Sequence, residues 1–279
     1  MPHARQIVWI LAVSSGLALF LQGRAPAAEP AAKLRILILS GANNHDWQHT
    51  TPVLQKFYEG SGRFAVTVTE KVPQMTAADF AGYDALVCNY TTYPNVRGHR
   101  WPAATEKAFL DYIAAGHGLV IFHAASTAWN DWPEFTDLIG LTWQMGTSAH
   151  GKYHSFAVTI LDREHPVTAG MQSFQHVPDE LYHRQLKHAT AHVLATAYSD
   201  KAAGGTGQDE PMIVTTEFGK GRVFHTAMGH DPRAMSGVEF QTLMLRGTEW
   251  AASGKVTIPI PADWPLAGKT SKAAAEKGK

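Results

Sequence analysis

The chain has 279 residues, of which 45% are hydrophobic and only 17% charged, so its composition is that of a globular protein and excludes a largely disordered one. Its 24 basic and 24 acidic side chains balance, which argues against a nucleic-acid-binding protein, since phosphate contacts need a basic face. The single cysteine excludes an intramolecular disulfide framework and a cysteine-rich zinc site, whereas 15 histidines indicate metal or proton chemistry.

Residues 1–28 are predicted to be a secretory signal. Arg5 supplies positive charge, residues 7–21 are an apolar run, and Ala25 to Ala27 offer a cleavage site with Ala28 as the alternative end. The run is short for a transmembrane helix, which needs about 20 residues; an uncleaved anchor is the alternative. We therefore expect an exported protein, periplasmic or extracellular, with no stable membrane anchor after cleavage.

Apolar runs and helical spacing alternate through the first half of the body. Strands are expected at 34–39, 64–70, 85–89 and 118–122, with helices at 51–59 and 103–114. Such alternation predicts an α/β fold with a mainly parallel sheet covered by helices.

The second half is predicted to be mixed. Strands are expected at 156–161, 193–198, 212–217 and 222–227, the last two joined by a hairpin turn, and helices at 133–141 and 237–252. No linker interrupts the body, so one domain is expected over 29–262, followed by a disordered tail, 263–279.

In parallel sheets, ligands bind outside the carboxyl ends of the strands. The segments at these ends include His45 with Asp46, and His230 with Asp231. An imidazole beside a carboxylate can bind a divalent metal or relay a proton. The alternative is that these residues only stabilise their loops, as Asn44 and its neighbours do in Asx turns.

His123 directly follows the predicted strand 118–122 and precedes small residues. Enzymes of this class place a nucleophile on such a sharp turn, so His123 is expected to be a ligand, base or hydrogen-bond donor; a buried packing histidine is the alternative. Ser126 has no G-x-S-x-G around it. Cys88 lies within a strand and is expected to be an inert core residue.

Two further groups complete the candidate site. Glu180 is a plausible acid or base and Tyr182 a hydrogen-bond donor, unless they belong to a solvated surface turn. Aromatic rings near the strand ends can stack on sugars. Trp132 and Trp143 are instead expected to bury the helix at 133–141.

Five motifs in order resemble the ThuA-like (trehalose-utilisation) family: SGANNHDWQHTTP, GHGLVIFHAASTAWNDWPEF, HPVTAG, DELYHR and GKGRVFHTAMGHD. The resemblance covers about 34–252. It implies a flavodoxin-like, class I glutamine amidotransferase-like three-layer fold and a role in the catabolism of trehalose-type disaccharides through keto-sugars. True glutamine amidotransferases need a cysteine where this chain has His123, so glutaminase activity is excluded.

The leading hypothesis is a carbohydrate-active isomerase, lyase or hydrolase without a cysteine nucleophile, which works by acid–base chemistry or with the help of a divalent metal ion. Its catalytic residues would be His123, Glu180 and Asp46. The metal ligands would be His45, His230 and Asp231. The sugar-binding residues would be Asn44, Trp47, Tyr90, Ser126, Trp129 and Tyr182. A non-catalytic sugar-binding protein and a structural partner of a surface complex are the alternatives, because the fold alone does not fix function.

Overall fold

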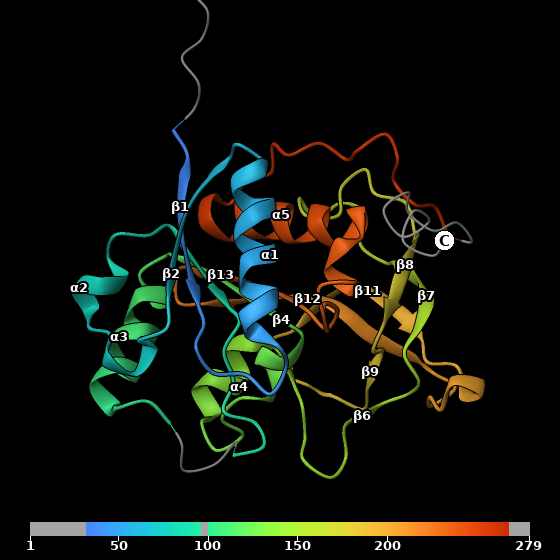
Figure 1. Ribbon diagram of the computed structural model, residues 1–279, viewed down its shortest axis with the longest axis horizontal. Helices are drawn as coiled ribbons and strands as arrows, with labels where there is room; N and C mark the ends of the chain where they lie inside the picture. The colour runs from blue at the N-terminus through green and yellow to red at the C-terminus, as the bar shows by residue number, and fades with distance from the viewer. Residues whose placement is uncertain (1–31, 96–99, 268–279) are drawn as a thin grey trace, which may run out of the picture. The chain divides into compact units, whose positions relative to one another are not determined.

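The computed structural model describes residues 32–95 and 100–267. These residues form a fold around a nine-stranded sheet (Figure 1). The strand order is β2-β1-β3-β4-β13-β12-β11-β7-β8. The predicted signal at 1–28 and most of the predicted tail lie outside the described residues.

One half of this sheet is parallel. Its strands are β2 (Phe64–Thr69), β1 (Leu34–Leu39), β3 (Ala85–Cys88), β4 (Gly118–Phe122) and β13 (Gly221–Thr226). β1, β3 and β4 are short, largely buried runs rich in Val, Ile and Leu, as strands covered on both faces are, whereas the edge strand β2 is only partly buried. The predicted α/β fold with a parallel central sheet is confirmed in these five strands, within a larger mixed sheet.

The other half is antiparallel, with β12 (Asp209–Phe218), β11 (His192–Tyr198), β7 (His154–Ile160) and β8 (Phe174–Asp179). Each pairs antiparallel with its neighbour, from β13 outward to β8. After four reversals, β8 points the same way as the parallel strands. Its carboxyl end therefore meets the edge where β1, β4 and β13 end.

Helices cover both faces, so the predicted three-layer arrangement is confirmed (Figure 1). Alternate residues of β1 serve the two layers, because successive side chains of a strand point to opposite faces. Ile36 and Ile38 pack with α1 (Trp47–Gly60) and α5 (Val238–Ser253). Leu37 and Leu39 pack on the opposite face, whose helices are α2 (Ala77–Phe80), α3 (Ala103–Ala114) and α4 (Pro133–Ile139).

Small elements complete the edge that carries the site. β6 (Ala149–His150) pairs with β9 (Tyr182–His183), which sets His150 opposite Tyr182. β5 (Leu141–Thr142) pairs with β10 (Leu186–Lys187). Short 3-10 turns lie at η1 (Val72–Gln74), η2 (His123–Thr127), η3 (Lys201–Ala203) and η4 (Ala234–Ser236).

Packing continues past residue 262, where we expect the domain to end. Leu266 pairs with Phe174 at the edge of β8, and the Trp264 indole donates to the Gln172 carbonyl at 3.1 Å. The first part of the expected tail, 263–267, is therefore part of the folded body. Of the helices in the described ranges, none has the length and apolar character needed to cross a bilayer.

Candidate functional site

His123 occupies a sharp turn at the end of β4. Its φ is +43°, in the left-handed region that non-glycine residues seldom adopt. The following 3-10 turn is closed by the buried Ser126 hydroxyl, which donates to the His123 carbonyl at 2.8 Å. The predicted strand-to-helix turn is present, and the strained backbone holds the imidazole at the strand end, as functional sites often do.

Four side chains from separate segments meet here. His45 follows β1, His123 follows β4, Glu180 follows β8 and His230 follows β13. One possible ligand atom from each lies within 4.8 Å of the others. The ring centroid of His45 is 4.8 Å from that of His123 and 4.7 Å from that of His230. These four residues are called the His/Glu cluster below.

Hydrogen bonds outside the cluster fix two of the imidazoles. Nδ1 of His123 donates to the Ala227 carbonyl at 3.0 Å. Nδ1 of His45 lies 3.3 Å from Oδ1 of Asn43, whose Nδ2 donates to Oδ1 of Asn89 at 3.2 Å. Because Nδ1 carries the proton in each case, Nε2 keeps a lone pair. This arrangement is typical of metal-binding histidines.

Glu180 brings a negative charge to the imidazoles. Its Oε2 lies 3.6 Å from His123 Nε2, and its Oε1 lies 3.4 Å from His230 Nε2 and 3.5 Å from His150 Nε2. Burial raises the pKa of Glu180, but the three histidines outweigh it and hold the pKa below its usual value. Glu180 is therefore a carboxylate at neutral pH.

The charges of the cluster differ from one imidazole to the next. Burial, with repulsion from His123 and His230, lowers the pKa of His45 to about 3. His45 is thus neutral and able to donate a lone pair. Burial also opposes charge on His230, but Asp231 and Glu180 outweigh it and raise its pKa.

Tyr182 lies against the cluster. Its hydroxyl donates to Nε2 of His123 at 2.8 Å, and its ring packs on Trp143 at 4.6 Å between centroids. Burial and the neighbouring carboxylates of Glu180 and Asp179 raise its pKa well above the usual value. The phenol therefore stays protonated and acts as a donor.

Three predicted site residues face elsewhere. The exposed Asp46 carboxylate accepts from His49 Nδ1 at 2.7 Å, beside the start of α1. Asn44 is exposed on the same loop. Trp47 begins α1 and lines a separate groove of about 310 Å³ with Val68. The loop turns into a helix at Trp47, so only His45 is directed into the cluster.

Asp231 stands behind the cluster. Its Oδ2 lies 3.7 Å from His230 Nδ1, while its Oδ1 accepts from the Tyr153 hydroxyl at 3.0 Å and from the Arg233 and Ala234 amides. These bonds orient Asp231 toward its own loop. Asp231, the predicted ligand, is therefore not one of the four residues whose ligand atoms come together.

The aromatic prediction needs correction. Trp129 is fully buried and stacks on Tyr90 at 6.0 Å, within a core cluster that includes Trp101. Neither ring presents a face to a ligand. Ser126 is also fully buried and closes the His123 turn. Trp143, expected in the core, is only partly buried and packs on Tyr182.

Some contributors to the site are not assigned by the sequence. Asn43 and Asn89 orient His45, Tyr153 binds Asp231, and His150 faces Glu180. The available signal is weak: Asn89 and His150 stand at strand ends, but nothing in their spacing indicates which loops meet. Cys88 is buried, and burial raises the pKa of its thiol to about 12, which fits the inert role expected for it.

Histidines away from the cluster predict a dependence of stability on pH. Burial lowers the pKa of His225 to about 4, so the unfolded chain binds this proton more readily between pH 6.5 and 4. We expect the burial of His225 to lower the free energy of unfolding by about 3 kcal/mol as the pH falls to 4. Denaturant titrations of wild type and His225→Gln check this: an equal acid slope in both would contradict it.

The comparisons with known proteins agree with this architecture. The ThuA family model, described as trehalose utilisation, matches residues 35–251. A ThuA-like protein from Parabacteroides merdae has 35% identity and a TM-score of 0.78, over 86% of this chain and 97% of its own. A ThuA-like protein from Bacteroides uniformis has 20% identity and a TM-score of 0.64, over 83% and 96%.

A cytoplasmic protein from Salmonella typhimurium, with 13% identity and a TM-score of 0.54 over 78% of this chain and 98% of its own, shares the fold alone. The comparison with curated proteins gives no match. The family match spans most of the chain and includes all four cluster residues, and it suggests a function related to trehalose utilisation. The chain belongs to the ThuA family.

Proposed function

We propose that this protein is an exported, metal-dependent enzyme that acts on a trehalose-type disaccharide or its keto-sugar derivative. The observation that carries the proposal is the His/Glu cluster, assembled from four segments at one edge of the sheet. The family supplies the sugar class. Export rests on residues 1–28 of the sequence.

The donor set fits a divalent metal ion. Three imidazole nitrogens and one carboxylate oxygen are ligands that zinc and neighbouring first-row metals accept. His45, His123, Glu180 and His230 would hold the ion, since one possible ligand atom from each lies within 4.8 Å of the others. The bonds that fix His45 and His123 supply the outer support that such sites need.

A bound divalent ion would stabilise negative charge that develops on an oxygen next to the reacting sugar carbon. The chain's own residues supply the proton chemistry. His123 would hold the ion through Nε2, and the Tyr182 hydroxyl, now 2.8 Å from that nitrogen, would then be available to donate to a sugar oxygen. His150 is half-exposed at the rim of the site, with its Nδ1 against the Gly151 carbonyl at 2.9 Å and its Nε2 facing Glu180 at 3.5 Å.

The bond from Tyr182 to His123 favours a second candidate, a metal-free acid–base site. In that case the phenol and imidazole form a proton-transfer pair at 2.8 Å. Glu180 and His230 would then hold the pair and the substrate through hydrogen bonds. The two candidates differ in the metal content of the protein.

The test combines metal analysis with a reaction readout. Purified protein is expected to contain one zinc, manganese or similar ion per chain. In D₂O it is expected to exchange hydrogen next to the carbonyl of keto-trehalose, followed by NMR. His49→Gln, which changes an exposed histidine of the same loop, should keep both properties.

The other outcomes are equally informative. Exchange without metal would favour the acid–base pair. Binding of the sugar with neither metal nor exchange would contradict both candidates and leave a non-catalytic sugar-binding protein.

A further inference from the structure

Asp179 is a fully buried carboxylate directly behind the cluster. Its Oδ2 accepts from the Gly229 amide at 2.7 Å, and its Oδ1 accepts from the Glu180 amide at 2.7 Å and the His230 amide at 3.2 Å. Glu180 and His230 are both cluster residues. One carboxylate thus ties together the two segments, after β8 and after β13, that bring them to the site.

A buried imidazole holds this carboxylate from the other side. His176 Nε2 donates to Asp179 at 2.9 Å, and His176 Nδ1 donates to Glu239 at 3.1 Å. An ionised carboxylate only accepts, so both ring nitrogens carry protons and the ring is an imidazolium. Burial opposes this charge, but the two carboxylates outweigh it and raise the pKa of His176 to about 9.

Glu239 extends the connection to α5. It lies in the first turn of that helix, where the helix dipole favours negative charge, and it also accepts from the Val177 amide at 3.1 Å. The path therefore runs from the start of α5 through His176 to Asp179. Its members are buried, and none belongs to the His/Glu cluster.

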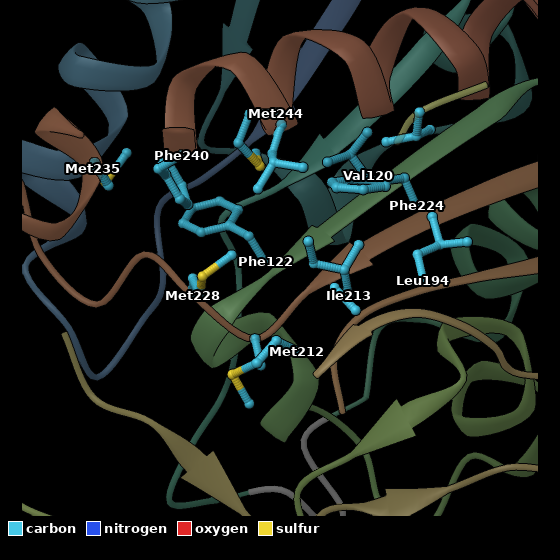
Figure 2. Packing of buried hydrophobic residues seen from close by; sticks show 14 of the residues in the cluster. Val120, Phe122, Leu194, Met212, Ile213, Phe224, Met228, Met235, Phe240 and Met244 are labelled. Carbon is cyan, nitrogen blue, oxygen red and sulfur yellow. The ribbon is translucent and has the colours of Figure 1, made fainter. Parts of the chain in front are cut away.

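The loop that Asp179 holds is tightly packed at Gly229. Gly229 has φ +109°, and a Cβ there would stand 2.7 Å from the Phe240 ring. Met228 beside it packs against Phe122 and Phe240 beneath α5 (Figure 2). With Met228 anchored in the core, the amides of Gly229 and His230 point at Asp179.

We propose that Asp179 is a positioning residue that holds Glu180 and His230 in metal-binding geometry, and that His176 and Glu239 keep its carboxylate in place. The inference rests on the proposed function for its metal. It goes beyond that function because it assigns a role to three buried residues that would touch neither metal nor sugar.

The test uses Asp179→Asn, which keeps the shape but turns one acceptor into a donor facing N–H groups. A second variant, Glu239→Gln, changes the other carboxylate that binds His176, and it is expected to have a smaller effect because His176 lies between Glu239 and Asp179. The matched control is Glu249→Gln, another buried α5 carboxylate, which accepts from Arg63 and the Thr257 and Ile258 amides. Each variant is titrated with Co²⁺ alone, followed by absorption, and amide hydrogen exchange is measured at Gly229 and His230.

We expect Asp179→Asn to weaken Co²⁺ binding 10- to 100-fold, as loss of an outer support does, and to speed exchange at both amides. Glu239→Gln should shift both readouts less and in the same direction, while Glu249→Gln leaves them unchanged. Folded variants with wild-type Co²⁺ affinity and wild-type exchange would overturn the inference. If wild type itself fails to bind Co²⁺, the proposed metal function fails, and exchange at the two amides alone decides the inference.

Discussion

Replacing His123 by asparagine is expected to lower the affinity for Co²⁺ or Zn²⁺ by more than about 100-fold, beyond the loss seen when only an outer support is removed. Hydrogen exchange next to the carbonyl of keto-trehalose should also be lost in this variant. The reason is that His123 contributes one cluster nitrogen and the acceptor of the Tyr182 hydroxyl. Metal titration and NMR in D₂O measure the two effects.

Asparagine is chosen because of the backbone. His123 has φ +43°, a conformation that asparagine tolerates better than alanine does. The unfolding free energy should therefore fall little, whereas alanine would mix strain with the loss of the imidazole. The matched control is His49→Asn, an exposed histidine outside the cluster. Wild-type metal affinity in folded His123→Asn would contradict the assignment of His123 as a ligand.

The position of the site follows from a rule that the sequence can apply. Buried apolar runs locate β1, β4 and β13, and ligand sites in parallel sheets lie beyond their carboxyl ends. This predicts the region of His45, His123 and His230 before any contact is known. The sharp turn at His123 is likewise readable from the small residues that follow it.

The fourth cluster residue shows where the sequence stops being informative. β8 reads FQHVPD, with a proline and few apolar residues, so its pattern does not predict a strand. Its direction, which brings Glu180 to the same edge, depends on four antiparallel pairings, of which only that of β12 with β13 is a tight hairpin. No local pattern encodes the other three pairings, and the same holds for the contact between Asp179 and the Gly229 loop.

The aromatic residues show a different limit. Trp129 and Trp143 both follow β4 and both stand near the predicted site, yet one is core and the other lies on Tyr182. Composition and proximity in sequence cannot separate them, because burial of a tryptophan is decided by partners such as Trp101, Tyr90 and Phe135. Their energetic roles can be separated by mutation.

Trp129→Ala is expected to lower the unfolding free energy by about 3–5 kcal/mol, as removal of a fully buried tryptophan does. The side chain packs edge-to-face on Trp101 at 4.5 Å and on Phe135 at 4.9 Å, so its loss leaves a cavity in a rigid aromatic cluster. Urea denaturation at neutral pH measures the change. Metal affinity of the remaining folded protein should stay within about twofold, because the cluster residues pack elsewhere.

Trp143→Ala is the matched comparison, because it also removes a tryptophan side chain, but one that lies at the candidate site. Trp143→Ala should lower the free energy of unfolding by about 1 kcal/mol, in the range of an average substitution. It should also weaken sugar binding, measured by calorimetry, because the indole lies against Tyr182 at 4.6 Å between ring centroids. The expected effects are thus the reverse of the sequence prediction, in which Trp129 binds sugar and Trp143 belongs to the core. A stable Trp129→Ala with weakened sugar binding would restore Trp129 as a sugar platform and would contradict its burial.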